Sequence, residues 1–185
     1  GYTNPFVLSI RALTPDGVHY RVAEFYKSGL MIDEIVSICQ QRKQLYNLEL
    51  FVADPSAPAN IEAFNRGGLN CIAANNDIRA GIDCQIRLFK EEKFFIFEDD
   101  NPLGVDEYST YHYPEPKEYT IDQDVKEPEP VKAHDHGCDA DRYVSMYLDK
   151  IQPTRTAHVD SSSRPEQNIK RIEWLKRGGS SRFSE

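Results

Sequence analysis

Two aspartates that are far apart in the sequence lie where an α/β fold can bring carboxylates together. Asp54 directly follows the apolar run Leu48 to Ala53, which is typical of a short buried strand. Asp135 lies just before Gly137 to Lys150, a segment with helical spacing of apolar residues. Ligand-binding groups in open α/β sheets gather at the carboxyl ends of strands. Because carboxylates are preferred ligands of Mg²⁺ and Mn²⁺, this pair suggests metal-assisted chemistry on phosphate.

Each of these acids also has an ordinary structural explanation. An aspartate in the Asp-Pro-Ser context of Asp54 is common in turns and at helix starts. Asp139 and Asp141 fall in the first turn of the helix expected after Asp135, and a helix N-terminus stabilises carboxylates whatever their function. Taken alone, Asp54 favours the structural explanation, and only its combination with Asp135 favours a metal site.

Other chemistries lack their motifs. His134, His136 and Cys138 alternate like zinc ligands, but the chain has neither the usual ligand spacing nor a second Cys/His pair. No G-x-x-x-x-G-K-[ST] motif is present, so this chain contains no P-loop ATPase. There is no G-x-S-x-G motif, and no serine or cysteine has a triad context. The interpretation that remains is a site for two divalent ions about 3.5–4 Å apart, as used in phosphodiester hydrolysis.

The elements that must position such a site follow from hydrophobic periodicity. Alternating residues on both sides of the turn Thr14 to Gly17 predict a β-hairpin. Apolar residues at helical spacing, with Asp77 as an N-cap and Gly67-Gly68 as a helix stop, predict helices between short apolar strands. The expected strands are 6–12, 19–26, 48–53, 69–73 and 93–97, and the expected helices are 31–46, 57–66 and 77–90. The order β-β-α-β-α-β-α-β is that of a layered α/β domain.

The second half of the chain is less regular. Tyr108 to Asp122 is β-like on both sides of Pro114 to Lys117, which predicts a mobile hairpin flap at the rim of the site. The spacing of Gly137 to Lys150 predicts a further helix. Beyond it the chain turns polar and carries several basic residues around Trp174. We therefore expect one domain over residues 1–152, followed by a polar linker and basic tail over residues 153–185.

Composition narrows the class of protein. The chain has 185 residues, which is enough for one domain with an apolar core. Four cysteines without a C-x-x-C pair predict a reducing compartment and no disulfides. No apolar run approaches the roughly 18 residues of a membrane span, and we expect no signal peptide. A net charge of −8 argues against an unassisted nucleic-acid binder, although a metal site also gathers carboxylates.

Several short motifs, taken in order, resemble the nuclease domain of tailed-phage terminase large subunits. Gly1 to Pro5 resembles the start of that domain, and Ala-Asp-Pro at 53–55 resembles its second acidic motif. Asp135-His136, followed by Asp139 to Tyr143, resembles the third motif, an Asp-His pair before a D-A-x-R-Y helix. Residues 76–82 are similar to the family's helix before the fifth strand. The resemblance covers about residues 1–150.

This resemblance implies an RNase H-like fold, with a central mixed β-sheet flanked by helices and an added β-hairpin flap. It implies a metal-dependent endonuclease that uses two Mg²⁺ or Mn²⁺ ions to cleave concatemeric viral double-stranded DNA during genome packaging. Asp54 and Asp135 match metal-ligand positions, and Asp139 matches a motif acid with a secondary or structural role. His136 could orient a water or the phosphate, or could simply cap the local turn. The family's first metal aspartate would lie just before Gly1.

The resemblance also implies partners. They are double-stranded DNA, the ATPase domain of the same polypeptide, the portal protein and the small terminase subunit, with no membrane. The expected location is the host cytoplasm, with transient docking on the viral procapsid. The cations available for DNA contact are Arg42, Lys43, Arg79 and Arg87, and Arg79 is the strongest single candidate because it begins the helix nearest the expected site. Each of them could also be a solvated surface residue.

Two other functions stay open. Another RNase H-like nuclease, of the resolvase or integrase type, would also use three or four carboxylates on one sheet. A non-enzymatic acidic viral scaffold protein would use its aspartates only to cap helices. The Asp-His pair with D-A-x-R-Y favours a terminase over the first alternative. A titration with divalent metal, followed by thermal melting, distinguishes the scaffold protein from a metal-dependent enzyme. A ligand that binds the folded state raises the melting temperature, so only a protein with a metal site should respond.

Overall fold

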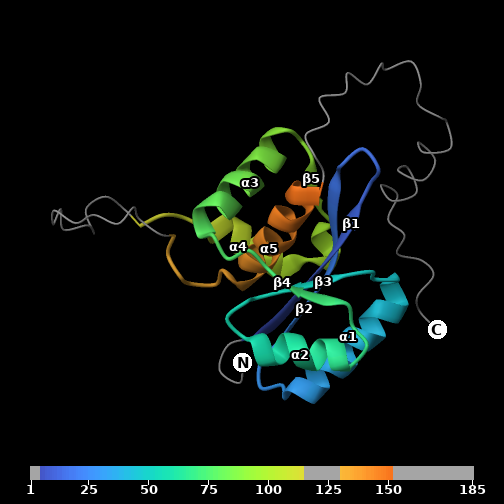
Figure 1. The fold of residues 1–185 in the computed structure, drawn as a ribbon. Helices are drawn as coiled ribbons and strands as arrows, with labels where there is room; N and C mark the ends of the chain where they lie inside the picture. Colours follow the sequence, from blue (N-terminus) through green and yellow to red (C-terminus); the bar gives the residue numbers. More distant parts are fainter. Residues whose placement is uncertain (1–4, 115–129, 152–185) are drawn as a thin grey trace. The chain divides into compact units, whose positions relative to one another are not determined.

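The computed structural model describes residues 5–114 and 130–151 (Figure 1). Its strands are β1 (Phe6–Leu13), β2 (His19–Lys27), β3 (Phe51–Ala53), β4 (Cys71–Ala73) and β5 (Phe94–Ile96). Its helices are α1 (Ile32–Tyr46), α2 (Pro58–Arg66), α3 (Ile78–Lys90), α4 (Pro102–Thr110) and α5 (His136–Ile151), with a short 3-10 helix, η1, at Glu98–Asp100. Up to β5, the element order is the predicted one.

The strands form two hydrogen-bonded groups. β1 and β2 make the predicted antiparallel hairpin, and β5 pairs in parallel with β2, so this three-stranded sheet is mixed. β3 and β4 form a separate parallel pair. The expectation of one central sheet is corrected in this respect, because the described strands are not all joined by backbone hydrogen bonds.

Helices pack against both groups of strands. Figure 1 shows α3 and α5 beside the hairpin, and α1 and α2 beside the β3–β4 pair. Helix α5 contacts both β1 and β3. One apolar core, which includes Cys39, Phe51 and Leu69, joins α1 and α2 to the strand pair. A second core, which includes Leu88 and Phe94, joins α3 and β5 to α5. Helix α5 therefore contacts both groups of strands, and Phe6, Leu8 and Phe25 of the hairpin also pack against the first core.

Local sequence signals explain several boundaries. The Asp77 carboxylate accepts a hydrogen bond of 3.0 Å from the backbone N–H of Ala80, so it caps α3 as predicted. Gly67 and Gly68 end α2, and Gly68 has a φ of 75°, which glycine adopts without steric cost. Pro58 stands in the first turn of α2, where its missing N–H removes no intrahelical hydrogen bond.

The first part of the predicted flap is wrong. Tyr108 to Thr110 complete helix α4 instead of forming a strand. A helix-start signal was present in Asn101-Pro102, but α4 has few apolar residues with which to show its period. The rest of the predicted hairpin falls mostly on residues 115–129, outside the described residues. The predicted tail, 153–185, also lies outside them, so the division into domain and tail stays a prediction.

The four cysteines lie in the interior of the fold. Cys39, Cys71, Cys84 and Cys138 are all free and buried. Burial raises the pKa of the Cys71 thiol to about 11 and that of Cys39 to about 12, so both stay protonated and act as small core residues. Within the described part of the chain, no helix combines the length and the apolar character needed to cross a membrane.

Candidate acidic site

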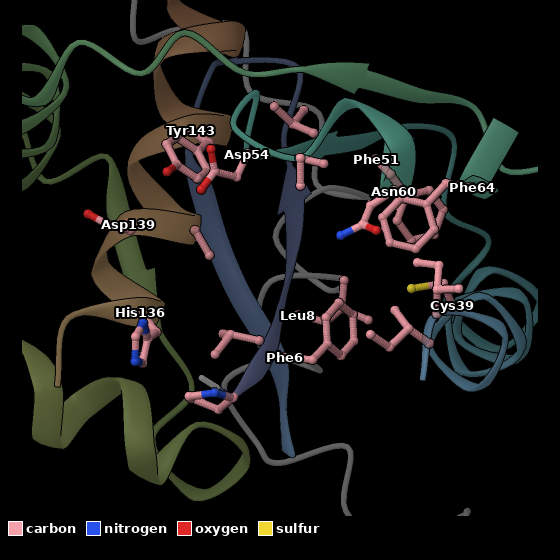
Figure 2. A pocket seen from close by; sticks show the side chains of 18 residues that line it. Phe6, Leu8, Cys39, Phe51, Asp54, Asn60, Phe64, His136, Asp139 and Tyr143 are labelled. Atoms are coloured by element: carbon pink, nitrogen blue, oxygen red, sulfur yellow. The ribbon is translucent and has the colours of Figure 1, made fainter. Parts of the chain in front are cut away.

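A cavity of about 250 Å³ lies where β1, α1, β3, α2 and the first turns of α5 meet (Figure 2). One part of its lining is apolar and belongs to the first core, with Phe6, Leu8, Cys39, Phe51 and Phe64. The other part is polar, with Asp54, Asn60, His136, Asp139 and Tyr143. Three of the residues predicted for the site, Asp54, His136 and Asp139, therefore line the same cavity. We call this polar part the acidic site.

Asp54 reaches the acidic site because it directly follows β3. Its side chain is exposed, and Oδ1 accepts a hydrogen bond of 2.8 Å from the backbone N–H of Ser56. This is the turn contact that the structural explanation of the aspartate expects. Since a carboxylate has two oxygens and accepts several bonds, the turn contact is compatible with binding a cation.

Asp139 lies in the first turn of α5 and lines the cavity. Its Oδ1 pairs with Nη2 of Arg142, one turn further along the helix, at 2.8 Å. Burial raises the pKa of Asp139, Arg142 lowers it, and the like charges of Asp135 and Asp54 raise it. The charges of Asp135 and Asp54 are thus both felt at the Asp139 carboxylate.

Asp135 and His136 stand at the start of α5. The His136 side chain is 37% exposed and lines the cavity, whereas Asp135 is 16% exposed and is not part of the lining. Oδ1 of Asp135 lies 3.9 Å from Nδ1 of His136. The Asp135 carbonyl oxygen accepts the backbone N–H of Asp139 at 2.8 Å, so this residue also begins the helix. Of the two acids on this segment, Asp139 lines the cavity and Asp135 does not, and the predicted role of Asp135 as a ligand stays a prediction.

Tyr143 and Asn60 were missed as candidates for the site. Tyr143 lies one turn after Asp139, and burial, together with Asp54 and Asp139, raises its pKa to about 12. Its hydroxyl therefore keeps its proton at neutral pH, and it donates to Oδ1 of Asn76 at 3.4 Å. The i, i+4 spacing from Asp139 was an available signal for Tyr143, because it places both residues on one face of the helix. Asn60, an exposed polar residue of α2, has no such signal.

The acidic site has the types of side chain that bind a divalent cation, but among the described residues too few of them lie close together to form a complete metal site. The carboxylates of Asp54 and Asp139 are hard oxygen ligands suited to Mg²⁺ and Mn²⁺, and His136 offers an imidazole nitrogen. Across residues 5–114 and 130–151, no three His, Cys, Asp or Glu side chains are grouped closely enough to hold a metal ion. A metal ion at the acidic site therefore stays a prediction.

The predicted DNA-contacting cations are spread over α1 and α3. Arg42 lies over the ring of Phe25, with 5.9 Å from its guanidinium carbon to the ring centroid. Lys43 donates to a backbone carbonyl at 2.8 Å, and Arg87 forms an ion pair of 2.5 Å with an aspartate of α5. Arg79 is exposed in the first turn of α3. None of the four belongs to the cavity lining, and their contact with DNA stays a prediction.

Asp141 follows Asp139 by two residues and anchors α5 to the rest of the fold. Its side chain is completely buried. Its carboxylate accepts hydrogen bonds from Ser9 of β1 (2.6 Å), Arg21 of β2 (2.6 Å) and Tyr108 of α4 (3.1 Å), and it forms an ion pair with Arg11 of β1 (3.0 Å). We call this set the Asp141 network. It fixes the rotation of α5, because a helix that buries Asp141 must turn Asp139 toward a different side.

Solved structures that resemble this one come from phage terminases. The large terminase of a thermophilic bacteriophage matches with a TM-score of 0.68 and 25% identity, over 82% of this chain and 38% of that one. The complex of that large terminase with ATP-γ-S matches with a TM-score of 0.66 and 26% identity, over 78% and 37%. The chain is a terminase-related domain. The chain spans well under half of the length of the thermophilic phage's large terminase. Any activity of that whole protein is therefore a proposal for this chain.

A second phage supplies a neighbour of similar size. The nuclease domain of the large terminase g2p from bacteriophage SPP1, solved with bound Mn, matches with a TM-score of 0.59 and 17% identity. The match covers 78% of the terminase-related domain and 79% of the SPP1 domain. At this identity it shows a shared fold. No protein-family model matches the sequence, and no curated protein matches it.

Proposed function

We propose that the terminase-related domain is a metal-dependent endonuclease with an RNase H-like fold, which cleaves concatemeric viral double-stranded DNA during genome packaging. The observation that carries this proposal is that Asp54, from the end of β3, shares a cavity with His136 and Asp139 of α5. Support for a divalent cation comes from the Mn bound to the SPP1 nuclease domain. The proposed cofactor is two ions of Mg²⁺ or Mn²⁺.

The residues of the acidic site have separable tasks in this proposal. Asp54 and Asp139 hold the cations, and Asp135 adds negative charge beside them or serves as a further ligand. Bound divalent ions supply Lewis-acid stabilisation of the charge on a phosphodiester. His136, which is partly exposed in the cavity, orients the phosphate or holds a proton. Tyr143 remains a hydrogen-bond donor at neutral pH because its pKa is about 12.

A domain of this charge needs help to hold DNA. With a net charge of −8, few phosphates can be neutralised, so unassisted binding is weak and strongly salt-dependent. The proposed contacts are Arg79, Arg42, Lys43, Arg87 and the tail of residues 153–185. We further propose that an ATPase domain of the same polypeptide, the portal and the small subunit hold DNA over the site and raise its local concentration. This takes place on the procapsid, in the host cytoplasm.

Plasmid cleavage in Mn²⁺ tests the proposal. The protein for this test is the chain extended upstream to include the aspartate that the family resemblance implies. Asp54→Ala, Asp135→Ala and Asp139→Ala should each abolish cleavage without unfolding the domain, because each removes negative charge from the cation position. Asp83→Ala, which removes an exposed acid of α3, is the matched control and should cleave at the wild-type rate. Full activity of both Asp54→Ala and Asp139→Ala would refute the proposal.

Thermal melting separates this enzyme from an acidic scaffold protein whose aspartates only cap turns. A ligand at about 100 times its Kd stabilises a folded protein by about 2.7 kcal/mol. We therefore expect Mn²⁺ to raise the melting temperature of the wild type and to leave that of an Asp54→Asn, Asp139→Asn double variant unchanged. A wild type that shows no response to Mn²⁺ would favour the scaffold protein.

A further inference from the structure

Glu107 of α4 contacts the beginning of α5, next to the acidic site. Its side chain is buried, and Oε2 accepts the backbone N–H of Gly137 at 2.5 Å and that of Cys138 at 3.1 Å. These are the first N–H groups after His136, and the first N–H groups of a helix have no partner within it. Glu107 therefore caps α5 from a neighbouring helix, doing what an N-cap side chain usually does within one segment.

The start of α5 has no room for a side chain at Gly137. A Cβ atom at Gly137 would collide with the hydroxyl of Tyr26 and would lie 2.8 Å from Oε2 of Glu107. The absence of a side chain is thus what allows the backbone of α5 to reach the carboxylate. The first turn of the helix is held between β2, which supplies Tyr26, and α4, which supplies Glu107.

Helix α4 is also capped at its start by a carboxylate from another element. The side chain of Glu24, on β2, accepts the backbone N–H groups of Leu103 at 2.8 Å and Gly104 at 2.9 Å, at the start of α4. Arg21 then connects Glu24, at 2.8 Å, with Asp141, at 2.6 Å. Strand β2 therefore holds the beginning of α4, and α4 holds the beginning of α5, through two carboxylates with little exposure to solvent.

We propose that Glu107 is a positioning residue for the acidic site. By binding the N–H groups of Gly137 and Cys138, it fixes the turn that carries His136 and Asp139, so that both line the cavity with Asp54. This role rests on the proposed metal function, because the residues that it positions are the proposed ligands. Residues that orient metal ligands without touching the metal commonly change its affinity by roughly tenfold to a hundredfold.

A titration of the whole chain with Mn²⁺, followed by the paramagnetic resonance signal of free Mn²⁺, tests this role. Glu107→Ala should weaken binding by roughly tenfold or more. Glu107→Gln should weaken it less, because its amide oxygen still accepts a hydrogen bond from the helix start. Asp106→Asn, which removes an exposed charge from the adjacent position of α4, is the matched control and should bind Mn²⁺ like the wild type.

Amide hydrogen exchange in the metal-free chain supplies a second measurement. In Glu107→Ala we expect Gly137 to Asp139 to lose protection while amides in the middle of α3 keep theirs. In Glu107→Gln we expect part of the protection at residues 137–139 to return. If Glu107→Ala does not fold, the exchange and Mn²⁺ affinity of Glu107→Gln decide the matter in the same way.

The outcomes are distinct. A folded Glu107→Ala chain with wild-type Mn²⁺ affinity and wild-type exchange at residues 137–139 would overturn the role. A loss of protection spread evenly over the domain in Glu107→Gln would indicate a general stabilising contact and would also overturn it. If the wild type binds no Mn²⁺, the proposed metal function fails, and local exchange at residues 137–139 alone decides whether Glu107 holds this turn.

Discussion

Asp139 and Asp141 lie two residues apart on α5 and have opposite surroundings. The Asp139 side chain is 35% exposed, lines the cavity and pairs with Arg142. The Asp141 side chain is completely buried and accepts hydrogen bonds from strands β1 and β2 and from α4. The same residue type on the same helix therefore belongs once to the candidate site and once to the framework that holds it.

The difference shows how a buried charge is compensated. Removing a carboxylate from water costs several kcal/mol unless cations and hydrogen bonds replace the water, and the Asp141 network supplies two guanidinium groups and two hydroxyls. At Asp139, burial and the neighbouring acids raise the pKa against the effect of Arg142. Its charge is thus the less well compensated of the two, and a bound cation would improve its surroundings.

The largest expected effect comes from breaking the Asp141 network. Asp141→Asn removes the counter-ion of Arg11 and one of the two counter-ions of Arg21, and both arginines stay buried, so we expect a loss of about 3–5 kcal/mol in the free energy of unfolding. Urea denaturation followed by circular dichroism measures this loss. A midpoint within error of the wild type would mean that the network does not support the fold.

His19, which contacts Arg11 of the Asp141 network, should make the stability of the fold depend on pH. Its side chain is buried and its Nδ1 lies 3.1 Å from Nη1 of Arg11. Burial, and then the charge of Arg11, lowers its pKa from 6.5 to about 4. Between these two values the unfolded chain binds a proton that the folded chain does not. Stability present above pH 6.5 is therefore lost as pH falls, by up to about 3 kcal/mol.

The variant His19→Gln isolates this contribution. Its amide oxygen still accepts a hydrogen bond from Arg11, but the side chain does not titrate. We expect a flatter dependence of the unfolding free energy on pH between 6.5 and 4 than in the wild type. Equal slopes for the two proteins would show that His19 is not the source of the acid sensitivity.

Gly81 of α3 tests the packing behind Arg142. A Cβ atom there would collide with Cγ and Cδ of Arg142 and would lie 3.0 Å from Sδ of Met146. Because overpacking in a close contact costs about 1–3 kcal/mol, Gly81→Ala should lower the unfolding free energy by an amount in that range. Ala80→Ser, at the exposed neighbouring position, serves as the control. If both variants unfold at the wild-type urea concentration, α3 and α5 do not meet as closely as described.

The smallest expected effect is that of Asp139→Asn. Its free energy of unfolding should fall by no more than about 1 kcal/mol at neutral pH, since Asp139 is 35% exposed and pairs with one buried cation, Arg142, whereas Asp141 is completely buried and pairs with two. The raised pKa of Asp139 means that its contribution to stability is lost as pH rises through the folded value. The free energy of unfolding of Asp139→Asn, relative to that of the wild type, should therefore be highest at high pH. A loss as large as that of Asp141→Asn would remove the distinction between the two acids.

Most elements of the fold were predictable because their signals are local. The turn at Thr14 to Gly17, the cap at Asp77 and the stop at Gly67-Gly68 all act within a few residues of the elements that they delimit. Helix α4 was missed because its stabilising contacts come from elsewhere. Its start is capped by Glu24 of β2, and its buried residues are Gly104 and Glu107, which carry no apolar signal.

The candidate site was predictable in part for the same reason. Asp54 was recognisable because it ends an apolar strand. The choice among Asp135, Asp139 and Asp141 depends on the rotation of α5, and that rotation is determined by Arg11 and Arg21, which lie far away in the sequence, near the start of the chain. No local pattern contains this information, so the assignment that the family resemblance implies, with Asp135 as a ligand and Asp139 in a secondary or structural role, stays a prediction.

The measurement that tests the central claim most directly is to soak crystals of the chain in Mn²⁺ and to locate the metal by its anomalous scattering. We predict a peak in the cavity, within about 2.0–2.2 Å of carboxylate oxygens of Asp54 and Asp139 and close to His136. The same crystals of Asp139→Asn should show a weaker peak or none. A cavity without a peak in the wild type, at Mn²⁺ concentrations that occupy other surface carboxylates, would contradict the account.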